Sequence, residues 1–115
     1  MICNTYKAFF QTLGDGTKLD ILFALKEHPR TVTELVGTLK IEQSNLSHQL
    51  AKLRKLGFVA FTREGKTKRY ALEHKTIFPL LSLIDKHVNR YYHTYCKCKG
   101  KARELRWQEK SKGGN

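Results

Sequence analysis

The residues best placed to do chemistry lie at the start of one leucine-rich segment, residues 44–57, which reads SNLSHQLAKLRKLG. Its leucines recur at three- and four-residue intervals, so they form one apolar stripe of a helix. Between them stand side chains that donate and accept hydrogen bonds: Ser44, Asn45, Ser47, His48 and Gln49. Amide, hydroxyl and imidazole groups of this kind contact base edges in a DNA groove, where Asn and Gln pair with adenine. The segment therefore predicts a helix that packs by its leucines and presents polar groups outward.

Basic side chains follow the polar group, first on the same helix and then around a turn. The sequence EGK joins two β-rich runs, FVAFTR and TKRYAL, which is a hairpin pattern with basic flanks. Cations at these places are suited to contact the sugar–phosphate backbone. The predicted DNA-binding residues are Gln43, Ser44, Asn45, Ser47, His48, Gln49, Lys52, Arg54, Lys55, Arg63, Lys66, Lys68 and Arg69. The alternative is a solvated surface helix whose Ser and Asn side chains only cap it.

Composition supports a polyanionic partner. The chain has 115 residues, enough for one domain, and a formal net charge of +12, which a nucleic acid or an anionic membrane surface would compensate. No apolar run approaches the ~20 residues that span a bilayer, and the amino end lacks the pattern of a leader, so we expect a cytoplasmic protein without membrane partners. The cysteines Cys3, Cys96 and Cys98 have no scaffold-like spacing and are expected to be reduced.

The elements that must position these residues follow from apolar spacing and capping residues. Helices are predicted over 5–13, 17–28, 31–40 and 44–57, then the hairpin, then a long helix over 76–95. Asp15 is expected to cap the second helix, and Thr31 or Thr33 the third. The predicted fold is mainly α with a small β-hairpin, in the order α-α-α-α-β-β-α. This is a winged helix-turn-helix over residues 1–95, followed by a basic tail over 96–115 that is partly helical or disordered.

Residues 13–72 resemble the ArsR/SmtB family of bacterial and archaeal repressors. The segments that carry the resemblance are LGDGTKLDIL, TVTEL, QSNLSHQLAKLRKLGFV and REGKTKRYAL, in the family's order and spacing. Gly16 stands where the family usually has Pro. The resemblance implies a homodimer formed by the first and last helices. It also implies binding to a palindromic operator, often with release by an effector, which the residues do not identify.

A dimer is also expected from apolar spacing alone. The last helix carries a heptad seam about five turns long, which is more apolar surface than a monomer of this size covers. The first helix carries an aromatic stripe. The predicted interface residues are Tyr6, Phe9, Phe10, Leu13, Ile77, Leu81, Ile84, Val88, Tyr91 and Tyr95. The alternative is that both stripes form the ordinary core of a monomer.

A sensor site is only partly matched. Among family members that bind metal, one site uses thiols at the start of the third helix, but TVTEL offers hydroxyls there. The other uses Asp-x-His on the last helix, matched by Asp85 and His87, with Cys98 as a third zinc ligand and no assured fourth. We therefore assign no metal cofactor. Oxidation at Cys96 and Cys98 is a second alternative, and a repressor without an effector is the simplest.

The main hypothesis is a sequence-specific DNA-binding transcriptional regulator, most simply a dimeric repressor that occludes a promoter. The competing hypothesis is an architectural or nonspecific nucleic-acid-binding protein, for which phosphate contacts suffice. An enzyme is not expected. The nucleophile candidates Cys96 and Cys98, with His93 as base, lie in one basic segment without an orienting acid.

Overall fold

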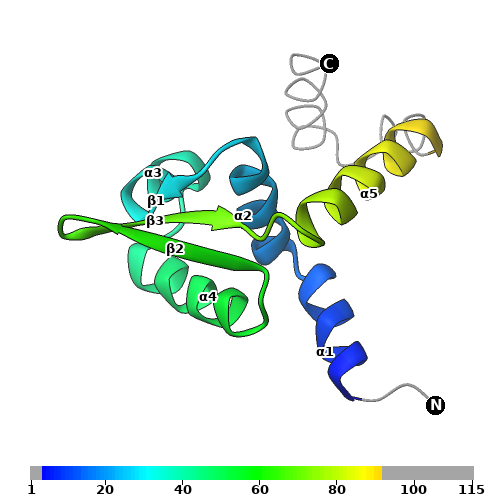
Figure 1. The fold of residues 1–115 in the computed structure, drawn as a ribbon, viewed down its shortest axis with the longest axis horizontal. Coiled ribbons are helices and arrows are strands. Elements are labelled where there is room, and N and C mark those ends of the chain that lie inside the picture. Colours follow the sequence, from blue (N-terminus) through cyan, green and yellow to red (C-terminus); the bar gives the residue numbers. More distant parts are fainter. Residues whose placement is uncertain (1–3, 92–115) are drawn as a thin grey trace. The chain divides into compact units, whose positions relative to one another are not determined.

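The computed structural model describes residues 4–91, which fold into the predicted succession of helices and hairpin (Figure 1). In chain order the elements are α1 (Asn4–Leu13), α2 (Gly16–Glu27), β1 (Arg30–Thr31), α3 (Val32–Leu39), α4 (Gln43–Lys55), β2 (Val59–Glu64), β3 (Thr67–Leu72) and α5 (Ile77–Tyr91). The chain divides into two compact units, one ending at Leu81 and the other beginning at Ser82, inside α5. The predicted boundary between a domain over 1–95 and a tail over 96–115 lies outside the described residues.

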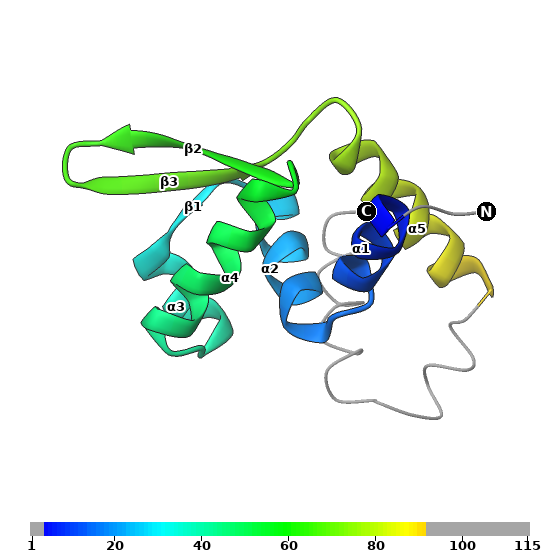
Figure 2. The same cartoon turned by 90° about the horizontal axis from the view of Figure 1, so that it is seen from below.

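The core of the first unit is built by leucines from α2, α3 and α4. Its fully buried side chains are Ile21, Leu22, Leu35, Leu46, Leu50, Leu53, Phe58 and Leu81. Figures 1 and 2 show the β2–β3 hairpin extending from this core beyond the helices. None of the described helices has the length and apolarity needed to cross a membrane.

The sheet has one strand more than the sequence predicts. Its order is β1-β3-β2, all antiparallel, and in the hairpin Phe61 pairs with Tyr70 and Arg63 with Lys68. The turn between β2 and β3 contains Gly65 with a φ of 64°, which a residue without a side chain adopts readily. The added strand β1 has two residues and pairs only with β3, a contact distant in sequence that no local pattern predicts.

Polar side chains cap three of the helices. The Asp15 carboxylate accepts a hydrogen bond from the backbone N–H of Lys18, at the start of α2. Thr31 and Glu34 form a capping box at the start of α3, which decides between the two capping residues that the sequence left open. Before α5, backbone N–H groups, first that of Ile77, donate to Glu73 and lower the pKa of its carboxyl to about 2.

Replacing Thr31 with Ala is expected to destabilise the protein by about 1 kcal/mol, because the backbone N–H of Glu34 loses its acceptor. The matched control is Thr33→Ala, which removes an exposed hydroxyl two residues later and should change the free energy of unfolding by less than about 0.5 kcal/mol. Urea unfolding of both variants measures the difference. Equal destabilisation by the two changes would contradict the assigned cap.

Candidate nucleic-acid interface

Helix α4 separates its apolar and polar residues onto opposite sides, as the sequence predicts. The side chains of Leu46, Leu50 and Leu53 are 0% exposed and pack into the core. The polar residues at its amino end are exposed: Gln43, Ser44, Asn45, Ser47 and His48. The leucines therefore fix the helix to the domain and leave these side chains at the surface.

The amino end of α4 differs from those of α2, α3 and α5 because no side chain caps it. Glu42 occupies the N-cap position in an extended conformation, and its side chain makes no capping hydrogen bond. Backbone N–H groups in the first turn of a helix have no partner within the helix and carry partial positive charge. The start of α4 is thus suited to accept a phosphate oxygen beside the polar side chains.

Gln49 is the one member of the predicted polar group that the structure draws inward. It is half-buried, and its Nε2 donates to Oδ1 of Asn45 at 3.3 Å. Its Oε1 is buried and has no hydrogen-bond partner among residues 4–91. The contact orients the Asn45 amide, and no acceptor within residues 4–91 takes up its two N–H groups. Gln49 therefore holds the exposed Asn45 side chain in place and is not itself part of the exposed polar group.

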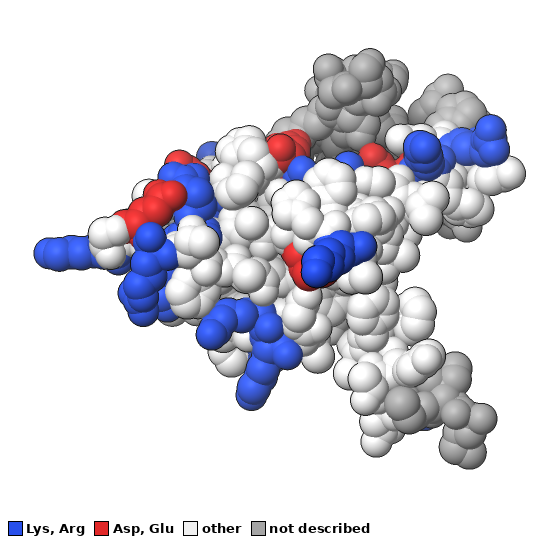
Figure 3. All heavy atoms as spheres, viewed as in Figure 1, with Lys and Arg blue, Asp and Glu red and all other residues white. Residues whose placement is uncertain are grey.

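The basic residues of α4 lie in two different places. Lys52 and Lys55 line a hollow together with Gln11 of α1 and Lys18 of α2. Arg54 lies over the ring of Phe61 in β2, with its Cζ atom 4.8 Å from the ring centroid. Only Arg54 therefore joins the basic side chains of the hairpin. Figure 3 shows Lys and Arg gathered over the hairpin tip at the left of the view and along the lower edge, where α4 lies.

Arg69 has partners within the chain. Its Nε donates to Oε2 of Glu64 at 2.8 Å, and its Nη1 to Oε1 of Glu34 at 3.3 Å. The hydrogen bond to Glu64 is the main cause of a raised pKa at Arg69. The backbone N–H of Thr31, and then Arg69, lower the pKa of Glu34. Two carboxylates already compensate the Arg69 guanidinium, so we leave it out of the proposed interface.

The aromatic stripe of α1 is largely exposed. Tyr6 is 60% and Phe10 63% exposed, whereas Phe9 stacks on Phe58 with ring centroids 5.1 Å apart and Leu13 is half-buried. Tyr6 and Phe10 lie four positions apart, on the same side of α1, and adjoining exposed apolar groups mark interaction surfaces more often than scattered ones do. The exposed pair is therefore suited to cover another surface.

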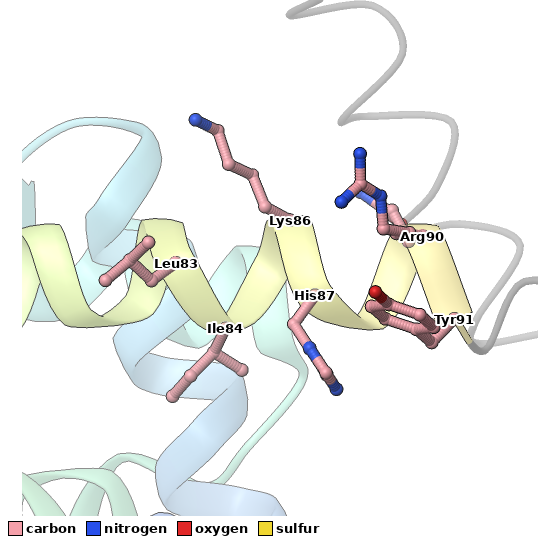
Figure 4. Close-up of a pocket in the computed structure, with 7 residues that line it drawn as sticks. Leu83, Ile84, Lys86, His87, Arg90 and Tyr91 are labelled. Carbon is pink, nitrogen blue, oxygen red and sulfur yellow. The ribbon is translucent and has the colours of Figure 1, made fainter.

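The seam on α5 is divided between the protomer's own core and its surface. Ile77 and Leu81 are buried in the chain's own core, so only the predicted seam residues beyond Leu81 stay accessible to a second molecule. Leu83 and Tyr91 are each 64% exposed, and Figure 4 shows Ile84 and Tyr91 projecting from α5. Leu83 lies one position off the heptad series, so the spacing did not predict it as an interface residue. Tyr95, the last residue of the predicted seam, lies outside the described residues.

The described residues do not assemble a metal site. Asp85 is half-buried, and the exposed His87 lies 4.7 Å from Tyr91 between ring centroids. Within residues 4–91 no group of three or more His, Cys, Asp or Glu side chains is arranged to hold an ion. Cys98, the predicted third ligand, lies outside this range, as do Cys96 and His93.

Comparison with known proteins gives one consistent family. A model of the arsR family of bacterial regulatory proteins matches residues 15–60. Rv0081 of Mycobacterium tuberculosis, a helix-turn-helix transcriptional regulator, is 39% identical over 83 residues, which cover 71% of this chain and 73% of that protein. Its crystal structure matches with a TM-score of 0.70 and 36% identity, over 77% of this chain and 93% of that one.

Two further proteins extend the comparison. A transcriptional repressor SmtB homolog of Synechocystis is 30% identical over 80 residues, 70% of this chain and 61% of that protein. The homodimeric DNA-binding domain of Mb0332 from Mycobacterium bovis matches with a TM-score of 0.68 over 78% of this chain and 87% of that one; at 23% identity it shows the fold alone. Taken with the winged helix-turn-helix fold, these matches place the chain in the arsR family of bacterial regulatory proteins, which regulate transcription and are not enzymes.

Proposed function

We propose that the protein is a dimeric repressor that binds a palindromic operator and blocks transcription from the promoter that contains it. Helix α4 of each protomer enters the major groove, and the β2–β3 hairpin lies along the adjacent backbone. Base edges are contacted by Ser44, Asn45 and His48, and phosphates by the amino end of α4 and the basic hairpin. A protein with this function acts where the chromosome is, in the cytoplasm.

The observation that carries this proposal is the division of α4 into a buried leucine stripe and an exposed, uncapped polar start. A helix that served only to close the core would gain stability from a side-chain cap, typically about 1 kcal/mol. Here the cap is missing at the end where Asn45 and His48 are exposed. An anion supplied from outside would satisfy the same N–H groups.

Dimerisation is supported by apolar surface on both of the helices predicted to form the interface. Tyr6 and Phe10 of α1 are exposed, and so are Leu83 and Tyr91 of α5. Mb0332, which shares the fold, is homodimeric. A twofold dimer that sets its recognition helices about one DNA turn apart, ~34 Å, would bind two inverted half-sites. Repression is supported by similarity to the SmtB homolog, which is a transcriptional repressor.

Selection of bound sequences from a random duplex pool tests this function. We expect one inverted-repeat sequence to be enriched and to bind at physiological salt at least about 1,000-fold more tightly than random DNA. The net charge of +12 favours a second candidate, nonspecific binding, which predicts no enriched sequence and equal affinity for all duplexes. The pool therefore separates the two functions in one experiment.

Asn45→Ala and His48→Ala are each expected to cost about 1–3 kcal/mol of discrimination between the selected and random duplexes. Affinity for random DNA should change little, because phosphate contacts remain. His74→Ala, at an exposed position before α5, is the matched control and should keep the wild-type ratio. Competition binding with both duplexes measures these ratios. An equal loss of affinity for both duplexes would contradict the assignment of base contacts to α4.

A further inference from the structure

The pleat of the β2–β3 hairpin sorts its charged residues between two faces. Residues that pair directly across antiparallel strands point to the same side, and alternate positions share a face. Phe61, Arg63 and Lys68 therefore lie on one face, with Tyr70 opposite Phe61. Glu64 and Arg69 lie on the other face, where they form their ion pair. The carboxylate of Glu64 therefore lies on the opposite face from Arg63 and Lys68.

The pairing of Arg63 with Lys68 is unfavourable for the hairpin alone. Like charges directly opposite each other on neighbouring strands repel and destabilise the sheet. Among residues 4–91, neither side chain forms an ion pair, and neither does Arg54, which approaches the same face from α4. Three uncompensated cations from α4, β2 and β3 thus converge on one place.

The ring of Phe61 is the group they share. The Nζ of Lys68 lies 4.6 Å, the Cζ of Arg54 4.8 Å and the Cζ of Arg63 6.0 Å from its centroid. The electron-rich face of an aromatic ring attracts cations and offsets part of their mutual repulsion. The ring is itself held by Tyr70, with centroids 5.3 Å apart. Phe61 therefore restricts where three long, otherwise mobile side chains place their charges.

We propose that Phe61 is a positioning residue that holds Arg54, Arg63 and Lys68 as one clamp for the phosphates of a DNA strand, at the junction of α4 and the hairpin. The clamp deepens the proposed function and depends on it. A duplex backbone is the partner that fits, because it presents successive negative charges beside the groove that α4 enters. Cations already ordered by the ring lose less side-chain freedom when they bind.

The test compares Phe61→Leu, which removes the ring, with Phe61→Tyr, which keeps it. Affinity is measured against salt concentration on the selected duplex and on a random duplex of equal length. We expect Phe61→Leu to weaken both complexes by roughly 3- to 10-fold and to make the plot of log affinity against log salt shallower by about one. The ratio between the duplexes should not change. Phe61→Tyr should keep the wild-type slope.

Charge variants provide the reference. Arg54→Gln, Arg63→Gln and Lys68→Gln should each make the salt slope shallower by about one, whereas Lys75→Gln, an equal charge change at an exposed loop position, should not. If Phe61→Leu does not fold, Phe61→Met replaces it, since a flexible thioether side chain fills the space without a ring. Circular dichroism and urea unfolding establish folding for each variant.

Several results overturn the clamp: an unchanged slope in Phe61→Leu, equal losses in Phe61→Leu and Phe61→Tyr, charge variants no different from Lys75→Gln, or no binding of any duplex by the wild-type protein. Failure of the proposed function looks different. The random pool would then yield no enriched sequence, while the effect of Phe61 on the salt slope would still be measurable on a random duplex.

Discussion

Combining Ile84→Asp with Tyr91→Asp is expected to give a monomer that binds the operator about 10²- to 10⁴-fold more weakly than the wild-type protein. Both residues belong to the predicted seam, seven positions apart and so on one side of α5, and Tyr91 is 64% exposed. A carboxylate at either place would be buried against a partner without compensation, which opposes association. A monomer contacts only one half-site, so it loses the gain from binding two linked sites together.

The control for this prediction is Lys86→Asp. It changes the net charge by the same two units on the same helix, but Lys86 projects from the side of α5 opposite Ile84 (Figure 4). Lys86→Asp should remain dimeric and lose only the electrostatic part of its affinity. Sedimentation velocity measures the oligomeric state, and titration with the selected duplex measures the affinity. A double variant that sediments as a dimer would exclude this side of α5 from the interface.

Leu50→Ala is expected to lower the free energy of unfolding by about 2–5 kcal/mol. Leu50 is fully buried between Leu46 and Leu53, so removal of its branched end leaves a cavity that the packed core cannot readily fill. A domain of this size has a total stability of only about 5–15 kcal/mol, so a loss at the upper end would leave much of the protein unfolded at 37 °C.

Ser47→Ala is the matched control on the same helix. Ser47 is exposed, and its truncation should change stability by less than about 0.5 kcal/mol. Urea unfolding followed by circular dichroism gives both values. Equal midpoints for Leu50→Ala and the wild-type protein would mean that α4 is not anchored by its leucines. The remaining folded fraction of Leu50→Ala should still prefer the selected duplex, since its polar residues are intact.

Local patterns in the sequence predicted the helices and the hairpin because the physical causes are local. Leucine spacing identified α4, Asp15 marked the start of α2, and the start of α3 was predicted at Thr31 or Thr33, of which the structure has Thr31. The strand β1 was missed because its two residues are stabilised only by pairing with β3. The burial of Arg30 was missed for a similar reason. Its Nε donates to the carbonyl oxygen of Ala24 at 2.9 Å, across the end of α2, so its role depends on a neighbour that composition does not reveal.

The candidate interface was predicted less completely, because charge alone does not say which partner a side chain has. By residue type Arg63, Lys68 and Arg69 are equivalent candidates for phosphate contact, but the fold places Arg69 with two carboxylates and the other two beside Phe61. Phe61 itself was part of an alternating strand pattern and gave no functional signal. The seam on α5 was ambiguous too, because heptad spacing is the same whether a residue such as Leu81 packs within the protomer or against a partner.

Helix α4 carries its buried leucines and its exposed polar residues at different positions. This has a consequence for how related regulators can come to bind different operators. The exposed side chains of Ser44 and His48 lie outside the packed interior, so exchanging them leaves the scaffold intact, whereas exchanging Asn45 removes the acceptor of the half-buried Gln49 amide. A gene library randomised at these codons should consist mostly of soluble, folded members with altered operator preferences. Retargeting the protein to a new promoter therefore leaves the buried leucines unchanged and affects, beyond these three positions, the Gln49 amide that is bonded to Asn45.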